Sequence, residues 1–302
     1  MNSPRHGFLP AACGAVVLLA GLALGRQEPG QAEGPPPVTI QPITLDVLLV
    51  KSGLGANSGL IVGGREIIAV DAKLSPETIQ AMLAEVKKTI PFPVTRIILT
   101  NSDADHIGGL PGFPKGLPIL CQEQTRADMV RAAAETPALA DYLPTQAFKD
   151  ELKIKSGRQS IVLRYFGPAH TSGDAVVFVD SVKTAFVGDL VFVGRDPVIR
   201  RAKGGSTTGL LKSLHALLDH RPHVEDFIPG HGDLVTRGEV ESLIRKIEIT
   251  RVKVQTFMAE GKSLEEIKKM LQVDTRPSAA GPRSPSLAEV IYEELSEAND
   301  KK

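Results

Sequence analysis

Tryptophan is absent from this 302-residue chain, which carries only three tyrosines and ten phenylalanines. Few flat rings are therefore present on which nucleic-acid bases or sugars could stack. An excess of either charge is also lacking, because 35 basic side chains are balanced by 35 acidic ones. A nucleic-acid-binding surface needs a positive field, so we expect no nucleic-acid partner. The hydrophobic content of 42% is that of a globular protein, and the length fits two domains or one large α/β domain.

Charged residues are missing between Phe8 and Gly25. A short basic start at Arg5, an apolar run and a small-residue exit predict a signal peptide over residues 1–25. A membrane anchor is the alternative, although Pro10 and several glycines disfavour a spanning helix. Both interpretations place the rest of the chain outside the cytoplasm, in the periplasm for example. Membrane contact is then expected only through an uncleaved anchor, followed by a flexible linker over residues 26–37.

Cysteine is scarce as well. Cys13 falls within the predicted signal, so its removal leaves Cys121 as the only thiol. A single cysteine cannot form an internal disulfide, and stability must come from a hydrophobic core or from metal. Cys121 follows the apolar residues 117–120, which predicts a buried, unreactive thiol.

The body of the chain, residues 38–272, shows two blocks that each run from strands into helices. The first block has predicted strands at 38–50, 59–70 (a hairpin), 94–99 and 117–120, and helices at 75–86 and 122–134. The second has strands at 160–166, 175–179, 184–187 and 227–228, and helices at 206–218, 237–259 and 263–271. Residues 137–156 lack a clear period and are interpreted as a mixed insertion. Residues 273–302 are predicted to be a linker and a closing helix at 287–295.

Side chains able to bind metal gather in four loops, each of which follows an apolar strand. They are Asn101, Asp103, Asp105 and His106 in the first loop, His170 in the second, Asp189 in the third and His231 in the fourth. Active sites of α/β folds form at such strand ends. Crowded carboxylates repel one another unless a cation lies among them. The mixture of nitrogen and oxygen donors suits zinc, iron or manganese.

The order of these loops resembles the metallo-β-lactamase fold hydrolases. In that family a His-x-His-x-Asp-His loop is followed by a third His, a bridging Asp and a final His. The resemblance rests on Gly-Pro-Ala-His-Thr-Ser-Gly-Asp at 167–174, Gly-Asp-Leu at 188–190 and Pro-Gly-His-Gly at 229–232. It covers roughly residues 45–231. It implies an α/β protein with an αββα four-layer sandwich and a one- or two-metal site along one edge of the sheets.

The first loop departs from the family pattern, because Asn101 and Asp103 stand where the family has its first two histidines. By resemblance, the first metal position would consist of Asn101, Asp103 and His170, and the second of Asp105, His106 and His231, with Asp189 bridging the two. Because an amide oxygen is a weak donor beside imidazole, we expect one tightly bound zinc in the second position and weaker binding in the first. The carboxylate of Asp103 also resembles the di-iron branch of the fold, so a di-iron redox role is a further alternative. That branch uses a flavin domain, and none fits in this chain.

The resemblance implies metal-assisted hydrolysis, with Asp105 as the catalytic residue that binds metal and orients the attacking water. The expected substrate is a small ester, thioester or amide. Thioesterases of the glyoxalase type, lactonases and β-lactamases remain alternatives. A hypothesis from another class is a non-catalytic periplasmic metal- or ligand-binding protein with a degraded first position.

A basic loop follows Asp189, between Gly194 and Gly205. Its cations Arg195, Arg200 and Arg201, together with the nearby Lys203, are expected to bind a carboxylate of the substrate. The alternative interpretation is an ordinary solvated surface loop.

Overall fold

The computed structural model describes residues 37–274 and 284–300. The chain divides into residues 1–34 and a unit of residues 35–302. The predicted signal at 1–25 and nearly all of the predicted linker at 26–37 lie outside the described residues. Within the described part, none of the helices combines the length and the apolar character needed to cross a membrane.

The first sheet is made of seven strands in chain order. They are β1 (Val38–Pro42), β2 (Val47–Ser52), β3 (Ser58–Gly63), β4 (Glu66–Val70), β5 (Val94–Ile98), β6 (Ile119–Gln122) and β7 (Gln146–Phe148). Strands β1 to β4 pair antiparallel, and β4 to β7 pair parallel. The predicted hairpin is confirmed, with Gly63 paired to Glu66 across a turn in which Gly64 has a φ of +63°. That left-handed conformation favours glycine.

The second sheet has five strands in the order β12-β11-β10-β9-β8. They are β8 (Glu151–Ser156), β9 (Gln159–Tyr165), β10 (Ala175–Val179), β11 (Thr184–Gly188) and β12 (Asp226–Pro229). All pairs are antiparallel except β11 with β12. The region 137–156, predicted to be a mixed insertion, contains β7 and β8. It therefore carries the chain from the edge of one sheet to the edge of the other.

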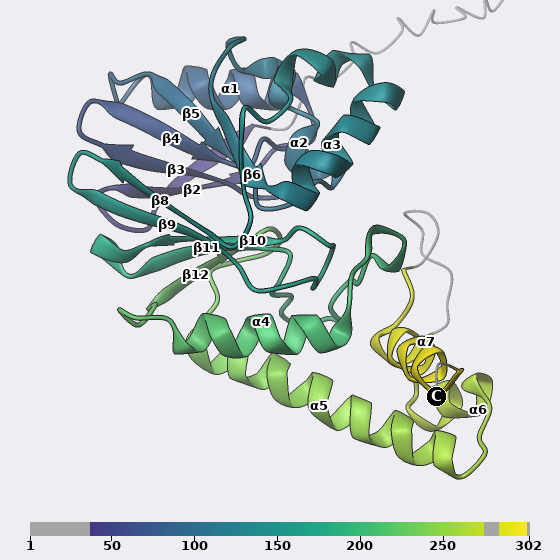
Figure 1. Cartoon of the computed structure of the whole chain (residues 1–302). Coiled ribbons are helices and arrows are strands. Elements are labelled where there is room, and N and C mark those ends of the chain that lie inside the picture. Colours follow the sequence, from purple (N-terminus) through teal and green to yellow (C-terminus); the bar gives the residue numbers. More distant parts are fainter. Residues whose placement is uncertain (1–36, 275–283, 301–302) are drawn as a thin grey trace, which may run out of the picture. The chain divides into compact units, whose positions relative to one another are not determined.

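Helices cover the outer faces of the two sheets (Figure 1). The first sheet carries α1 (Pro76–Val86), the short α2 (Ala104–Ile107) and α3 (Glu123–Glu135), and the second carries α4 (Thr207–Asp219) and α5 (Arg237–Ala259). Short 3-10 turns lie at Leu110–Gly112, Pro137–Tyr142, Asp180–Val182 and Arg201–Lys203.

Three apolar layers hold these four layers of structure together. Alternation along β5 shows how, since Ile97 packs toward α1 while its neighbour Ile98 packs between the sheets against residues such as Phe186. On the far side, Phe178 of β10 packs with Leu214 of α4. The fold is the αββα four-layer sandwich that the family resemblance implies. Cys121 is fully buried, and burial raises the pKa of its thiol to about 12.

The two C-terminal helices pack against α5 and not directly on the second sheet (Figure 1). They are α6 (Leu264–Met270) and α7 (Leu287–Asp300), so the predicted closing helix extends five residues further than expected. Buried Val290 and Ile291 of α7 share a hydrophobic cluster with Ile247 of α5. Glu294 of α7 accepts the backbone N–H of Thr207 at 2.7 Å and so caps the start of α4. The closing helix is thereby joined to the element that follows the basic loop.

Candidate metal centre

Six of the predicted metal ligands lie at the carboxyl ends of strands. They are Asp103, Asp105 and His106 after β5, His170 after β9, Asp189 after β11 and His231 after β12. Strands β9, β11 and β12 run in the same direction, because β10 is antiparallel to β9 and β11 while β12 is parallel to β11. Their loops therefore leave the second sheet at one edge. Backbone bonds join this edge to the first sheet, since Asn57 donates its N–H to Gly230 O at 2.6 Å.

The structure brings these residues into two groups whose donor atoms lie within 4.8 Å of one another. Asp105, His106 and His231 form the second position, and Asp103, His170 and Asp189 form the first. Asp189 contacts both groups. Its Oδ1 lies 3.4 Å from His106 Nε2 and 3.6 Å from His231 Nε2, and its Oδ2 lies 3.5 Å from His170 Nε2. A bridging carboxylate requires this arrangement.

Asp71 orients one of these ligands, and sequence reasoning did not identify it. Its Oδ2 accepts a hydrogen bond from His106 Nδ1 at 2.9 Å, while its two oxygens also accept the N–H and the hydroxyl of Thr100 at 2.8 and 2.7 Å. The proton on Nδ1 leaves the lone pair of Nε2 to face the metal position. The available signal was that Asp71 directly follows β4, as the ligand loops follow their strands.

The second position fits a divalent metal. His106 Nε2 and Asp189 Oδ1 are buried and make no hydrogen bond, although they lie 3.4 Å apart. Beside them, Asp105 Oδ2 lies 3.1 Å from His231 Nε2, and the side chains of Asp105 and His231 are 27% and 34% exposed. Two imidazole nitrogens and two carboxylates are donors that zinc accepts. The partial exposure leaves one side accessible from solvent.

The first position is arranged differently. Asp103 is 6% exposed, and its Oδ2 accepts Arg200 Nε at 2.8 Å while its Oδ1 accepts Lys203 Nζ at 2.7 Å. Burial raises the pKa of Asp103, but the hydrogen bond from His170 and the Lys203 ammonium outweigh it and hold the pKa below its usual range. His170 Nδ1 donates to Val198 O at 2.8 Å, and its Nε2 lies 3.2 Å from Asp103 Oδ2.

Asn101, the other predicted ligand of the first position, has a backbone partner. Its Oδ1 accepts the N–H of Asp103 at 2.8 Å, and its buried Nδ2 has no hydrogen-bond partner. The residue therefore shapes the loop before α2, and its role as a ligand stays a prediction.

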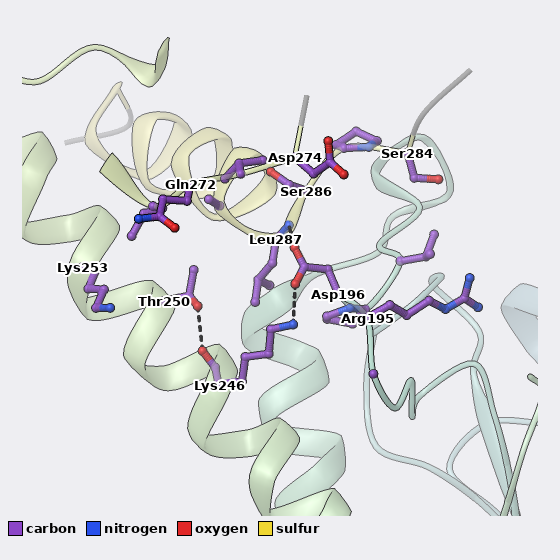
Figure 2. A pocket seen from close by; sticks show the side chains of 17 residues that line it. Arg195, Asp196, Lys246, Thr250, Lys253, Gln272, Asp274, Ser284, Ser286 and Leu287 are labelled. Carbon is purple, nitrogen blue, oxygen red and sulfur yellow. Dashed lines mark hydrogen bonds and ion pairs between the residues drawn. The ribbon is translucent and has the colours of Figure 1, made fainter. Parts of the chain in front are cut away.

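The three predicted substrate-binding arginines are directed to three different places. Arg200 binds Asp103, and Arg201 pairs with Glu297 of α7 at 2.8 Å. Both line a cavity of about 700 Å³ that also reaches Asp103 and Asp105. Arg195 lies over the Phe192 ring at 4.5 Å and lines a separate cavity of about 770 Å³ between α5 and the start of α7 (Figure 2). Of the three arginines, Arg200 and Arg201 therefore border the cavity next to Asp103 and Asp105, and Arg195 does not.

Gly230 allows the fourth loop to approach the other donors. A Cβ at this residue would lie 2.9 Å from His106 Cε1 and closer still to Asp189 Oδ1. We expect Gly230→Ala to weaken zinc binding by about 10- to 100-fold, because both donors must move away. Zinc competition titration measures this. Gly238→Ala is the control, since a Cβ there meets nothing within 4 Å. Equal zinc affinity for the two variants would contradict the expectation.

Metal binding should weaken as the pH falls. Burial lowers the pKa of His106, but the charges of Asp189 and Asp71 outweigh it and raise the pKa well above its ordinary value. The hydrogen bond to Asp103 similarly outweighs the effect of burial on His170. A metal ion that binds these histidines must therefore compete with protons that the surrounding carboxylates help to hold.

Zinc affinity is thus expected to rise with pH by about 10-fold per unit for each proton released. The rise should continue above the ordinary pKa of histidine, because the relevant pKa values are raised. Calorimetric zinc titrations in two buffers of different ionisation enthalpy measure the released protons. An affinity that stays constant from about pH 6 to about pH 8 would show that the expectation is wrong.

Known proteins are similar to this chain over much of its length. A family model described as the metallo-beta-lactamase superfamily matches residues 52–231. The metallo-beta-lactamase type 2 of Bacillus cereus is 22% identical over 184 residues, which cover 60% of this chain and 69% of that protein. The 2,4-dinitroanisole O-demethylase subunit alpha of Nocardioides sp. (strain JS1661) is 25% identical over 213 residues, which cover 70% of this chain and 62% of that protein.

Solved structures show the same fold. A metallo-beta-lactamase from Pontibacter korlensis superposes with a TM-score of 0.60 at 19% identity, over 69% of this chain and 99% of that one. The part left unmatched amounts to about a third of the chain, and the family model itself ends at His231.

Proposed function

Since this chain belongs to the metallo-beta-lactamase superfamily, we propose that it is a metal-dependent hydrolase acting on a small ester-, thioester- or amide-type substrate. One observation carries the proposal. The unpartnered His106 Nε2 and Asp189 Oδ1 lie beside the partly exposed Asp105 and His231. Buried polar atoms without partners are costly, so such a set is retained where a ligand completes it.

The residues of the second position, together with Asp71, have distinct roles in the proposed hydrolysis. A divalent metal held by Asp105, His106, His231 and Asp189 supplies, when bound, a Lewis acid that lowers the pKa of water toward neutrality. Burial raises the pKa of Asp105, but the hydrogen bond from His231 and the charge of His106 outweigh it and lower the pKa. Asp105 is thus ionised at neutral pH and can orient a water molecule and accept its proton. Asp71 keeps His106 in the orientation that this requires.

Zinc is the proposed metal, because two imidazoles and two carboxylates match its preferred donors. Iron and manganese remain alternatives for the same set. The proposed substrates include thioesters, lactones and β-lactams. We add nitroaryl methyl ethers, because one relative is named an O-demethylase. The cavity of about 700 Å³ has the size of a small-molecule site.

We also propose that the protein is exported, on the basis of the predicted signal over residues 1–25. N-terminal sequencing of the protein from periplasmic and membrane fractions tests this. Cleavage near Gly25 supports the signal, whereas an intact N-terminus in the membrane fraction supports the anchor. A cytoplasmic protein with an intact N-terminus would exclude both interpretations.

The hydrolase proposal is tested by measuring hydrolysis after metal is removed and after it is added back. Protein stripped with a chelator should lose all activity on the panel of thioesters, lactones, β-lactams and ethers, and one of zinc, iron and manganese should restore it. Metal content measured alongside the rates identifies which. Stoichiometric metal with tight ligand binding and no turnover would instead support the non-catalytic metal- or ligand-binding protein.

A further inference from the structure

Two cations of the basic loop bind the Asp103 carboxylate of the first metal position. Lys203 Nζ lies 2.7 Å from Asp103 Oδ1 and 3.1 Å from Ser102 O, and Arg200 Nε lies 2.8 Å from Asp103 Oδ2. Both carboxylate oxygens of Asp103 therefore already accept hydrogen bonds from cations. A metal ion at Asp103 would have to share this carboxylate with both cations or displace them.

The loop backbone fixes these cations in place. Arg200 donates its N–H to His170 O at 2.8 Å, and Lys203 donates its N–H to Arg200 O at 2.8 Å within the 3-10 turn Arg201–Lys203. Between them, Arg201 is anchored to Glu297 of α7. The preceding Ile199 is 3% exposed and belongs to the core beneath the second sheet. The backbone of residues 199–203 is therefore held next to Asp103 by hydrogen bonds, by the Arg201–Glu297 ion pair and by the buried Ile199.

Charge also disfavours a second metal at this place. Asp103 and Asp189 bring two negative charges to the first position, and Arg200 and Lys203 bring two positive ones beside Asp103. A divalent ion bound to Asp103 would meet an ammonium and a guanidinium at close range, although solvent screens part of this repulsion because the Arg200 and Lys203 side chains are 47% and 36% exposed. The second position has no lysine or arginine ion-paired to its ligands among the described contacts.

We propose that Arg200 and Lys203 permanently take the place of the first metal, so that the chain holds a single divalent ion, in the second position. The proposal rests on the proposed function for the presence of that ion. It assigns the loss of the first metal to the cation pair and not to Asn101, whose Oδ1 is already bonded to the Asp103 N–H. The positive charge of the first position then comes from Arg200 and Lys203, and it does not depend on the concentration of free metal.

Zinc stoichiometry tests this directly. Metal-free protein is titrated with Zn²⁺, and bound zinc is measured by mass spectrometry after buffer exchange. The wild type should saturate at one zinc per chain. The double variant Arg200→Met/Lys203→Met, which keeps unbranched apolar stems but removes both charges, should gain a second zinc with at least about 10-fold higher affinity than any second site of the wild type.

Two matched variants separate the causes. Arg195→Met removes a cation of the same loop that contacts Phe192 and not Asp103, and it should stay at one zinc. Asn101→His should also stay at one zinc. A second zinc gained by Asn101→His alone would overturn the proposal, as would a double variant that folds, as shown by its circular dichroism, but remains at one.

The wild-type result keeps the test decisive if the double variant does not fold. Two zinc ions bound with comparable affinity by the wild type would overturn the proposal while leaving the hydrolase intact. One zinc without hydrolysis of any panel substrate would support the proposal and count against the hydrolase. A protein that binds no zinc, iron or manganese would contradict both the single-metal proposal and the hydrolase proposal.

Discussion

Replacement of Asp105 by asparagine is expected to reduce hydrolysis by about 1,000-fold, the contribution typical of a positioned general base. The substitution keeps the size of the side chain and one oxygen, but removes the group that accepts the proton of water. Because the Asp105 side chain is 27% exposed and its carboxylate pairs with His231 among the described contacts, the fold should survive. The measurement is kcat/KM on the best panel substrate, at equal metal content.

A control lies in the fourth loop. Asp233 is 85% exposed and pairs with Lys51, so Asp233→Asn removes a carboxylate near the site without touching the metal donors. It should retain wild-type kcat/KM. If Asp105→Asn retains more than about a tenth of the activity while binding normal metal, Asp105 is not the base.

Asp71→Ala is expected to give the largest loss of stability among single changes at the site. Asp71 is 3% exposed, and its removal leaves the Thr100 N–H, the Thr100 hydroxyl and His106 Nδ1 without their acceptor. Buried donors left in this way cost about 3–5 kcal/mol in the free energy of unfolding. Urea denaturation of the metal-free protein measures the change.

Zinc affinity provides a second readout. Asp71→Asn keeps one oxygen acceptor and should lose less stability than Asp71→Ala, yet lower zinc affinity by about 10- to 100-fold because His106 is less firmly oriented. The control is Asp141→Ala, which breaks an exposed ion pair with Lys115 and should change the unfolding free energy by less than about 0.5 kcal/mol. Wild-type zinc affinity in Asp71→Asn would show that Thr100 alone holds His106.

Local patterns were sufficient to predict most of the fold. The hairpin at Gly63–Glu66 and the apolar stripes of α4 and α5 each depend on neighbours within a few residues, so periodicity and turn chemistry identify them. Strands β7 and β8 were missed because β7 is only three residues long and β8 has its outward face covered in charge. Their pairing with β6 and β9 is what defines them.

Contacts between distant segments account for what the sequence could not predict at the site. Arg200 and Asp103 are 97 residues apart, and nothing in the basic loop indicates a carboxylate as its partner. A substrate anion and a protein carboxylate present the same chemistry to an arginine. Asp71 and His106 are 35 residues apart and meet only because β4 and β5 are parallel neighbours that end together.

Distribution of the donors over both sheets links metal capture to the completion of folding. Asp105 and His106 follow β5 of the first sheet, whose last strand in the chain, β7, ends at Phe148. His231 follows β12, the last strand of the second sheet. During synthesis from the N-terminus, a partial chain that ends before Pro229 has no complete site to offer. Bound ion therefore stabilises only the finished sandwich. At a free metal concentration of about 1,000 times Kd it adds about 4 kcal/mol to the free energy of unfolding. A melting temperature that rises with zinc concentration would register this coupling even without a known substrate.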